Sequence, residues 1–200
     1  MSEAHQPRVA AQVALSLLEA LRSVDSPGEK LENEVVARTI PRRLGLSEVV
    51  ERQIELYREY ARQGRKLSDE ELADFTRLVK KRPDAARVFC EMGVKLAEKH
   101  MPGRKWWLPR VLRFRMVRRA TRRTLRKLFG QRVGGFVSGT FSLEVSASPL
   151  VQLDSTGDAC ELVTGFCQRA VGMGVGGDLK VVKQSCETRG DRVCKWSLKE

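Results

Sequence analysis

The chain has 200 residues, with 37 lysines and arginines against 25 acidic residues and a formal net charge of +12. This length is enough for one domain with a hydrophobic core of its own. No run of 18 or more apolar residues occurs, which argues against a membrane-spanning helix, and the first residues lack the basic and apolar regions of a signal peptide. The cysteine count is odd; without an export signal, this predicts reduced thiols and a cytoplasmic protein.

The first hundred residues predict helices. Ser47 is a suitable N-cap for one of them, and Gly64 ends it. Ser68 and Glu71 have the spacing of a capping box for the next. Apolar residues at helical spacing and these end signals together predict helices over residues 8–24, 29–40, 47–63, 68–81 and 83–100. We therefore expect a helical N-terminal region over residues 1–103, which contains no catalytic or metal-ligand spacing.

The next segment carries the net charge. Residues 99–143 hold thirteen lysines and arginines and no acidic residue, whereas the remaining 24 basic and 25 acidic residues nearly cancel. Pro109 is well placed in the first turn of a helix over about 109–129. The side chains expected off its apolar side, and so available to bind a surface, are Arg115, Arg119, Arg122 and Arg126.

Several interpretations of this basic helix remain open. It can simply cover a sheet, with its arginines in water or paired with acids of other helices. The neighbouring pair Trp106 and Trp107 also suits contact with an anionic membrane surface. Nucleic acid, an anionic ligand such as the carboxylates of a tetrapyrrole, and a protein partner are further candidates. Charge alone does not separate these alternatives.

After Gly130 the pattern changes to strands. Phe141, Leu143 and Val145 alternate with polar residues and share one face. A second strand is predicted over 150–153, followed by a helix over 158–171 and a closing hairpin. The sequence thus predicts an α+β fold, in which an N-terminal helical layer packs on a small antiparallel sheet. Residues 104–200 form the second of the two expected regions.

Three cysteines in this second region are candidate metal ligands. If the hairpin loop has three residues centred on Gly190, then Cys186 and Cys194 lie opposite each other, with Cβ atoms about 4.5–5.5 Å apart. Cys160 begins the helix packed on that hairpin and would add a third thiolate. Zinc is the candidate ion. The alternatives are buried reduced thiols and a disulfide between Cys186 and Cys194.

The order of these residues resembles the 4-vinyl reductase domain family over roughly residues 110–200. The resemblance implies a small-molecule-binding α+β fold, related in outline to TRAPP subunits and to sensor domains of aromatic-responsive regulators, and a homodimer. In such sensors three cysteines and a glutamate hold a structural zinc. The glutamate position is Lys183 here, a poor ligand, which leaves Glu187 or water for the fourth place. The matching residues are Cys160, Gly165-Phe166, Cys186, Gly190-Asp191, Cys194 and Trp196.

The resemblance and the residues together favour the binding or sensing of a small hydrophobic molecule. The expected pocket lies between sheet and helices, and its candidate walls are Phe136, Phe141, Leu143 and Phe166. The alternative function is a 4-vinyl reductase or an accessory protein of bacteriochlorophyll and tetrapyrrole biosynthesis. Since the sequence has no convincing nicotinamide or flavin site, we favour a binding protein over an enzyme. A nucleic-acid-binding adaptor is the third hypothesis, and the basic helix would place the protein at the periphery of a membrane.

Overall fold

The computed structural model describes residues 9–25, 48–103, 105–130, 135–136, 141–146, 154 and 156–199. The predicted helix over 29–40, the N-cap Ser47 and the predicted strand over 150–153 lie outside these residues. The helices are α1 (Ala11–Asp25), α3 (Glu48–Arg62), α4 (Asp69–Lys80), α5 (Ala85–His100), α6 (Arg110–Phe129) and α8 (Glu161–Gly174). The strands are β1 (Val9–Ala10), β2 (Lys66–Leu67), β3 (Gly135–Phe136), β4 (Ser142–Val145), β5 (Lys180–Ser185) and β6 (Cys194–Lys199).

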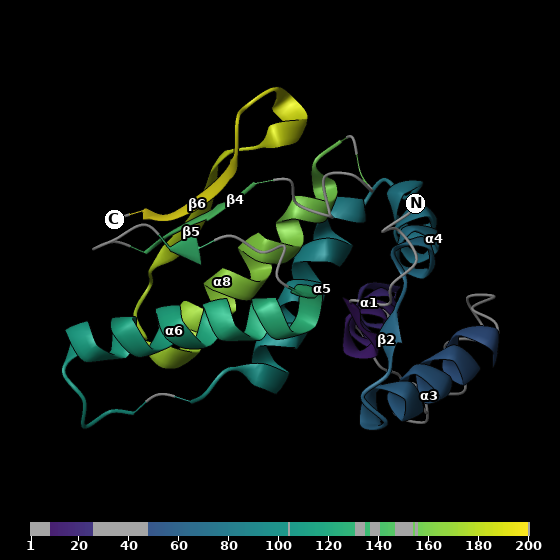
Figure 1. Ribbon diagram of the computed structural model, residues 1–200, viewed down its shortest axis with the longest axis horizontal. Helices are drawn as coiled ribbons and strands as arrows, with labels where there is room; N and C mark the ends of the chain where they lie inside the picture. Colours follow the sequence, from purple (N-terminus) through teal and green to yellow (C-terminus); the bar gives the residue numbers. More distant parts are fainter. Residues whose placement is uncertain are drawn as a thin grey trace, which may run out of the picture.

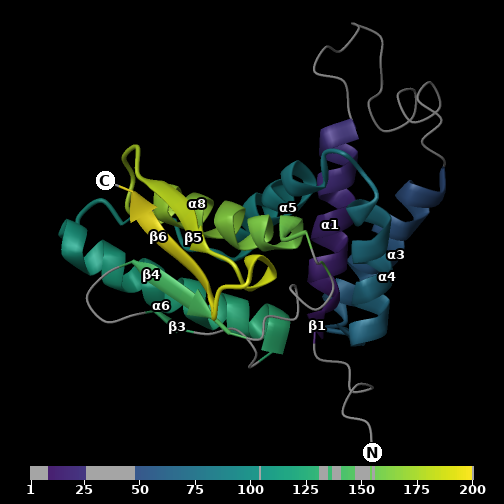
Figure 2. The same ribbon diagram turned by 90° about the horizontal axis from the view of Figure 1, so that it is seen from above.

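Mixed helix and antiparallel sheet confirm the α+β class. Strands β3, β4, β6 and β5 form one four-stranded antiparallel sheet in that order. This sheet lies at one end of the molecule and helices α1, α3 and α4 lie at the other, with α5 and α8 between them (Figures 1 and 2). Helix α6 runs across α8 and contacts β3. None of the helices in the described segments is both long and apolar enough to cross a bilayer.

The predicted helix ends are mostly confirmed. The Ser68 hydroxyl accepts from the Glu71 N–H and the Glu71 carboxylate accepts from the Ser68 N–H, so the capping box forms at the start of α4. Gly64 follows α3 with a φ of +69°, a left-handed conformation that glycine adopts without strain. Pro109 is the N-cap of α6 rather than its first residue.

The sequence predicted a purely helical N-terminal region, but the structure adds a short pair of strands there. Val9 pairs with Leu67 and Ala10 with Lys66 in a two-residue antiparallel ladder. Strands this short carry no detectable alternation. The pairing forms because the turn after α3 returns the chain to the start of α1, where the Ala11 N–H donates to the Arg65 carbonyl. Val9 and Leu67 are thereby buried.

Helices α5 and α8 pack with their backbones in close contact. A Cβ on Gly93 would lie 2.0 Å from the Leu162 carbonyl oxygen, and one on Gly165 would lie 2.1 Å from the Cys90 carbonyl oxygen. Two glycines on facing helices therefore let the backbones touch. The buried core is continuous from Val9 to Trp196 across this contact. The sheet itself packs mainly against α8 and α6, so the N-terminal helices reach it through α8 and do not form the layer on the sheet that the sequence predicted.

Candidate metal centre

The three predicted cysteines come together at one buried point. Cys160 is the last residue of the 3-10 turn η3 (Asp158–Cys160) and the N-cap of α8, Cys186 directly follows β5, and Cys194 opens β6. The sulfur of Cys160 lies 3.7 Å from that of Cys186 and 3.9 Å from that of Cys194, and the last pair is also 3.9 Å apart. All three residues are at most 1% exposed.

The hairpin loop differs from the predicted three-residue turn. Residues 187–193 separate Cys186 from Cys194, and the turn η4 (Glu187–Arg189) occupies the first part of this loop. The two cysteines still face each other because the last ladder pair is Ser185 with Lys195. Gly190 closes η4 with a φ of +90°, and the Asp191 carboxylate then accepts the Cys186 N–H at 2.8 Å. The Gly-Asp pair thus orients Cys186 from inside the loop.

Cys160 is held by a residue that the sequence did not single out. Asp154 is 1% exposed, and its carboxylate accepts from the N–H and hydroxyl of Thr156 and, at 2.8 Å, from the N–H of Ala159. Burial acts to raise the pKa of Asp154, but these hydrogen bonds lower it below its ordinary value. The ionised carboxylate fixes the turn that ends in Cys160. An Asp-x-Thr-Gly sequence before a helix is the signal for such an Asx turn.

Gly157 lets the turn of Cys160 approach the hairpin loop. Its φ is +85°, and a Cβ at this position would lie 2.6 Å from the Thr188 hydroxyl and 3.4 Å from the Cys186 sulfur. Any other residue would therefore be both strained and crowded. Within the hairpin loop, the Thr188 hydroxyl also lies 3.0 Å from the Cys186 sulfur.

The environment of the sulfurs favours unequal ionisation. Burial raises the pKa of Cys160, and the nearby sulfurs of Cys194 and Cys186 raise it further. Burial likewise raises the pKa of Cys194. Burial acts in the same direction on Cys186, but hydrogen bonds from Thr188 and from the other two cysteines reverse the effect and lower its pKa. Cys186 therefore ionises first, and a bound cation is needed to hold all three groups as thiolates.

The described residues supply three strong ligands at this point. Cys160, Cys186 and Cys194 have their sulfur atoms within 4.8 Å of one another and can hold a metal ion; within the described part of the chain, no carboxylate or histidine joins that group. Lys183, at the position where the resembled sensors have glutamate, pairs with Glu161 and donates to the Gly157 carbonyl at 3.2 Å. The Glu187 N–H donates to the Cys194 sulfur. Glu187 thus acts on the site through its backbone.

The remaining cysteines lie apart from the centre. Cys167 is fully buried two turns along α8, and burial raises its pKa to about 12. Cys90 is half-buried on α5. No disulfide joins the cysteines, all five of which are free. The sulfurs of Cys186 and Cys194 are 3.9 Å apart and do not form the alternative disulfide.

The four candidate residues for the wall of a ligand pocket differ in how deeply they are buried. Phe136 and Phe141 form an edge-to-face pair with ring centres 4.8 Å apart, and the Arg118 guanidinium lies 5.5 Å from the Phe136 ring centre. Phe136 is half-buried. Leu143 and Phe166 have no exposed surface and belong to the packed core. The assignment of all four to a ligand pocket stays a prediction.

The predicted basic side chains share one exposed side of α6. The side chains of Arg115, Arg119, Arg122 and Arg126 are exposed, while Val117, Thr121, Leu125 and Leu128 on the other side of the helix are buried. This arrangement agrees with the amphipathic helix expected from the sequence, and it leaves the four guanidinium groups in contact with solvent.

No family model, curated protein or solved structure matches this chain.

Proposed function

We propose that this protein is a binding domain of the 4-vinyl reductase type, in which zinc fastens the C-terminal hairpin and a small hydrophobic molecule binds beside the sheet. The sulfur triangle carries the zinc assignment. In a tetrahedral site with zinc–sulfur bonds of about 2.3 Å, ligand sulfurs lie about 3.8 Å apart. The separations here are 3.7 and 3.9 Å.

The donor set also suits zinc better than the common alternatives. Thiolates are soft ligands that favour zinc and copper(I) over magnesium or calcium, which prefer oxygen. Three cysteines supply three of the four places of a tetrahedral site. Water, or a group from a bound molecule, would take the fourth place, since Lys183 is engaged with Glu161 and Gly157.

Zinc at this point would stabilise the wall of the proposed ligand site. Cys194 opens β6, whose Trp196 pairs with Leu143 of β4, and Leu143 pairs with Phe136 of β3. Directly paired residues lie on the same face of a sheet, so Phe136, Leu143 and Trp196 form one cross-strand row. The Trp196 indole N–H donates to the Thr164 hydroxyl of α8 at 3.0 Å. The metal therefore anchors the strand that holds this row against the helix.

The aromatic pair beneath Arg118 indicates the chemical class of ligand. Phe136 is half-buried and packs edge-to-face on the buried Phe141, so its ring offers an apolar surface, and the Arg118 guanidinium lies 5.5 Å from its centre. A hydrophobic molecule with a carboxylate would use both features. A carboxylate-bearing aromatic ring system, such as a tetrapyrrole, belongs to this class.

Native mass spectrometry of the full chain, purified from its own host, tests both parts of the proposal. We expect one zinc ion per chain and a bound organic molecule. Cys186→Ser should remove the zinc, whereas Cys90→Ser, at a half-buried cysteine outside the centre, should retain it. Phe136→Ala should reduce the organic adduct without loss of zinc. A metal-free wild-type chain, with Cys160, Cys186 and Cys194 recovered as free thiols after denaturation, would refute the zinc assignment, and a wild-type chain without adduct would refute the ligand assignment.

A further inference from the structure

Four large apolar side chains are exposed together at the start of α6. Trp106 is 81% exposed, Trp107 64%, Val111 76% and Leu112 42%. Single exposed apolar residues are common, but a contiguous group marks an interaction surface. The loop before α6 extends along the edge of the molecule that is distant from α1, α3 and α4 (Figure 1). We call these four residues the apolar tip.

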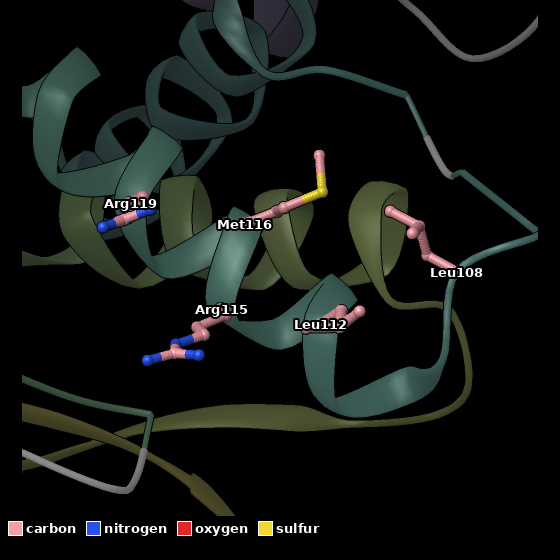
Figure 3. A pocket seen from close by; sticks show the side chains of 5 residues that line it. All are labelled: Leu108, Leu112, Arg115, Met116 and Arg119. Atoms are coloured by element: carbon pink, nitrogen blue, oxygen red, sulfur yellow. The ribbon is translucent and has the colours of Figure 1, made fainter.

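A groove continues from the apolar tip along α6. It has a volume of about 390 Å³ and is lined by Leu108, Leu112, Met116, Arg115 and Arg119. Figure 3 shows Leu108 on the loop and Leu112 and Met116 on the helix, with the two arginines further along. The groove thus has an apolar end next to the tip and a cationic end.

The cationic end extends along the exposed side of the helix. Residues three and four apart in a helix are neighbours on one side, which places Arg115, Arg119, Arg122 and Arg126 in a single line behind Leu112. We call these four arginines the basic stripe. Within the described residues, none of the four makes an ion pair with a carboxylate. Across the part of the chain that the structure describes, the stripe thus presents positive charge without a paired carboxylate.

We propose that the apolar tip and the basic stripe together bind the surface of a bilayer containing anionic phospholipids. Tryptophan and aliphatic side chains at one end of the helix would enter the boundary between headgroups and acyl chains, and the arginines behind them would bind lipid phosphates. This arrangement uses both the apolar and the charged parts of the surface. It is independent of the metal and ligand proposed above.

Two other occupants account for only part of the surface. Nucleic acid would bind the arginines and could stack on the tryptophans, but it offers no apolar partner for Val111 and Leu112. A second copy would cover the apolar tip. A two-fold contact through the same surface would also bring the two basic stripes together, and like charges would oppose that approach.

Vesicle co-sedimentation of the full chain tests the proposal. The probes are vesicles of phosphatidylcholine alone and vesicles that contain about one third phosphatidylglycerol. We expect binding to the anionic vesicles that falls with salt, and little binding to the neutral ones. Tryptophan emission should shift to the blue on binding and be quenched by brominated lipids. In the variant Trp106→Ala/Trp107→Ala, the buried Trp196, 1% exposed, is the remaining tryptophan and should show neither change.

Paired variants separate the two parts of the surface. We expect Trp106→Ala/Trp107→Ala to weaken anionic-vesicle binding about ten-fold or more. Arg115→Glu/Arg119→Glu should weaken it at least about 25-fold, since each basic residue near an anionic surface contributes about five-fold. The controls are Leu78→Ala, at an exposed leucine of α4, and Arg62→Glu/Arg77→Glu, which makes the same change in net charge at exposed positions. Both controls should bind like the wild type.

Other outcomes would overturn the membrane assignment. Binding that survives both the tryptophan and the arginine changes would show that this surface is not responsible. If Arg62→Glu/Arg77→Glu also loses affinity for the vesicles, binding depends on net charge and not on the basic stripe. Absence of vesicle binding, with tight binding of a short DNA duplex, would assign the basic stripe to nucleic acid. A wild-type dimer that Trp106→Ala/Trp107→Ala converts to a monomer, without vesicle binding, would assign the apolar tip to a second copy. The zinc content of each variant reports separately on the metal centre.

Discussion

The metal centre and the exposed side of α6 contrast in the way their chemistry is positioned. At the centre, the three sulfurs are buried, and backbone hydrogen bonds hold the loops that carry them. Asp154 accepts from the Ala159 N–H next to Cys160, and Asp191 accepts from the Cys186 N–H. Along α6, a regular helix spaces four arginines that contact solvent. A small displacement would disrupt the first site, whereas the second tolerates motion because charge acts over several ångströms. Four predictions concern the buried side of this contrast, where small displacements matter, in order of decreasing effect.

The largest effect is expected at the sulfurs themselves. Cys160→Ser should abolish stoichiometric zinc binding. If free zinc exceeds its dissociation constant about a thousand-fold, the loss lowers the free energy of unfolding by about 4 kcal/mol, or roughly 8–16 °C in melting temperature. Thermal unfolding with and without a chelator measures this difference. A chelator that leaves the wild-type melting temperature unchanged would contradict the prediction.

The next effect concerns the helix contact behind the centre. In Gly165→Ala the new Cβ would lie 2.1 Å from the Cys90 carbonyl oxygen, so α5 and α8 must separate. We expect the free energy of unfolding to fall by about 3 kcal/mol or more, as measured by denaturant titration. Gly172→Ala is the control, because that Cβ would meet no atom within 4 Å; it should be neutral or slightly stabilising. Equal effects of the two changes would refute the close contact.

Asp154→Asn should have an intermediate effect on the metal. One carboxylate oxygen becomes an amide nitrogen that faces an N–H or hydroxyl donor of Thr156 or Ala159. The turn before Cys160 then loses a charged acceptor, which destabilises it by about 1–3 kcal/mol, and zinc affinity should fall about ten-fold or more. Competition with a chromophoric chelator measures the affinity. Asp178→Asn, at an exposed position of the loop after α8, is the control and should leave zinc affinity unchanged.

The smallest effect is a pH dependence at the end of α5. Burial lowers the pKa of His100, and Lys127 and Lys99 lower it further. Its folded pKa is thus below the unfolded value of about 6.5, so the unfolded chain binds the proton more readily. Stability should decrease as pH falls below about 6.5, down to the folded pKa. His100→Gln should remove this component; denaturant titrations of both proteins at pH 7.5 and pH 5.5 measure the difference.

Local signals predicted much of the fold. The capping box at Ser68 and the glycine after α3 involve residues close in sequence, so their geometry follows from the chain itself. The convergence of Cys160 on the hairpin was also predictable. The hairpin register places Cys186 opposite Cys194, and the start of the helix packed on the hairpin places Cys160 near both. The longer loop, with η4 between Cys186 and Gly190, was not: the same Gly-Asp pair suits loops of several lengths.

Other features depend on contacts between distant segments and left no local signal. The β1–β2 pairing requires α3 to return the chain to α1, and the glycine contact of α5 with α8 requires knowledge of which helices cross. The charge of α6 was evident from its arginines, but the exposure of Trp106 and Trp107 was not. Tryptophans next to an amphipathic helix are as compatible with a core as with a surface, and only the packing of α6 on α8 decides between them.

The close contacts of Gly93 with α8 and of Gly165 with α5 have a consequence for dissecting the protein. They join a helix encoded before residue 103 to one encoded after it, and the apolar side of α8 has no other cover equal to α5 in the described structure. A truncated gene that starts at residue 104 would therefore produce a chain in which the apolar side of α8 that normally packs on α5 is exposed to water. Co-expression of the two halves as separate polypeptides should restore a stable assembly, since the packing of α5 on α8 requires no covalent link between them.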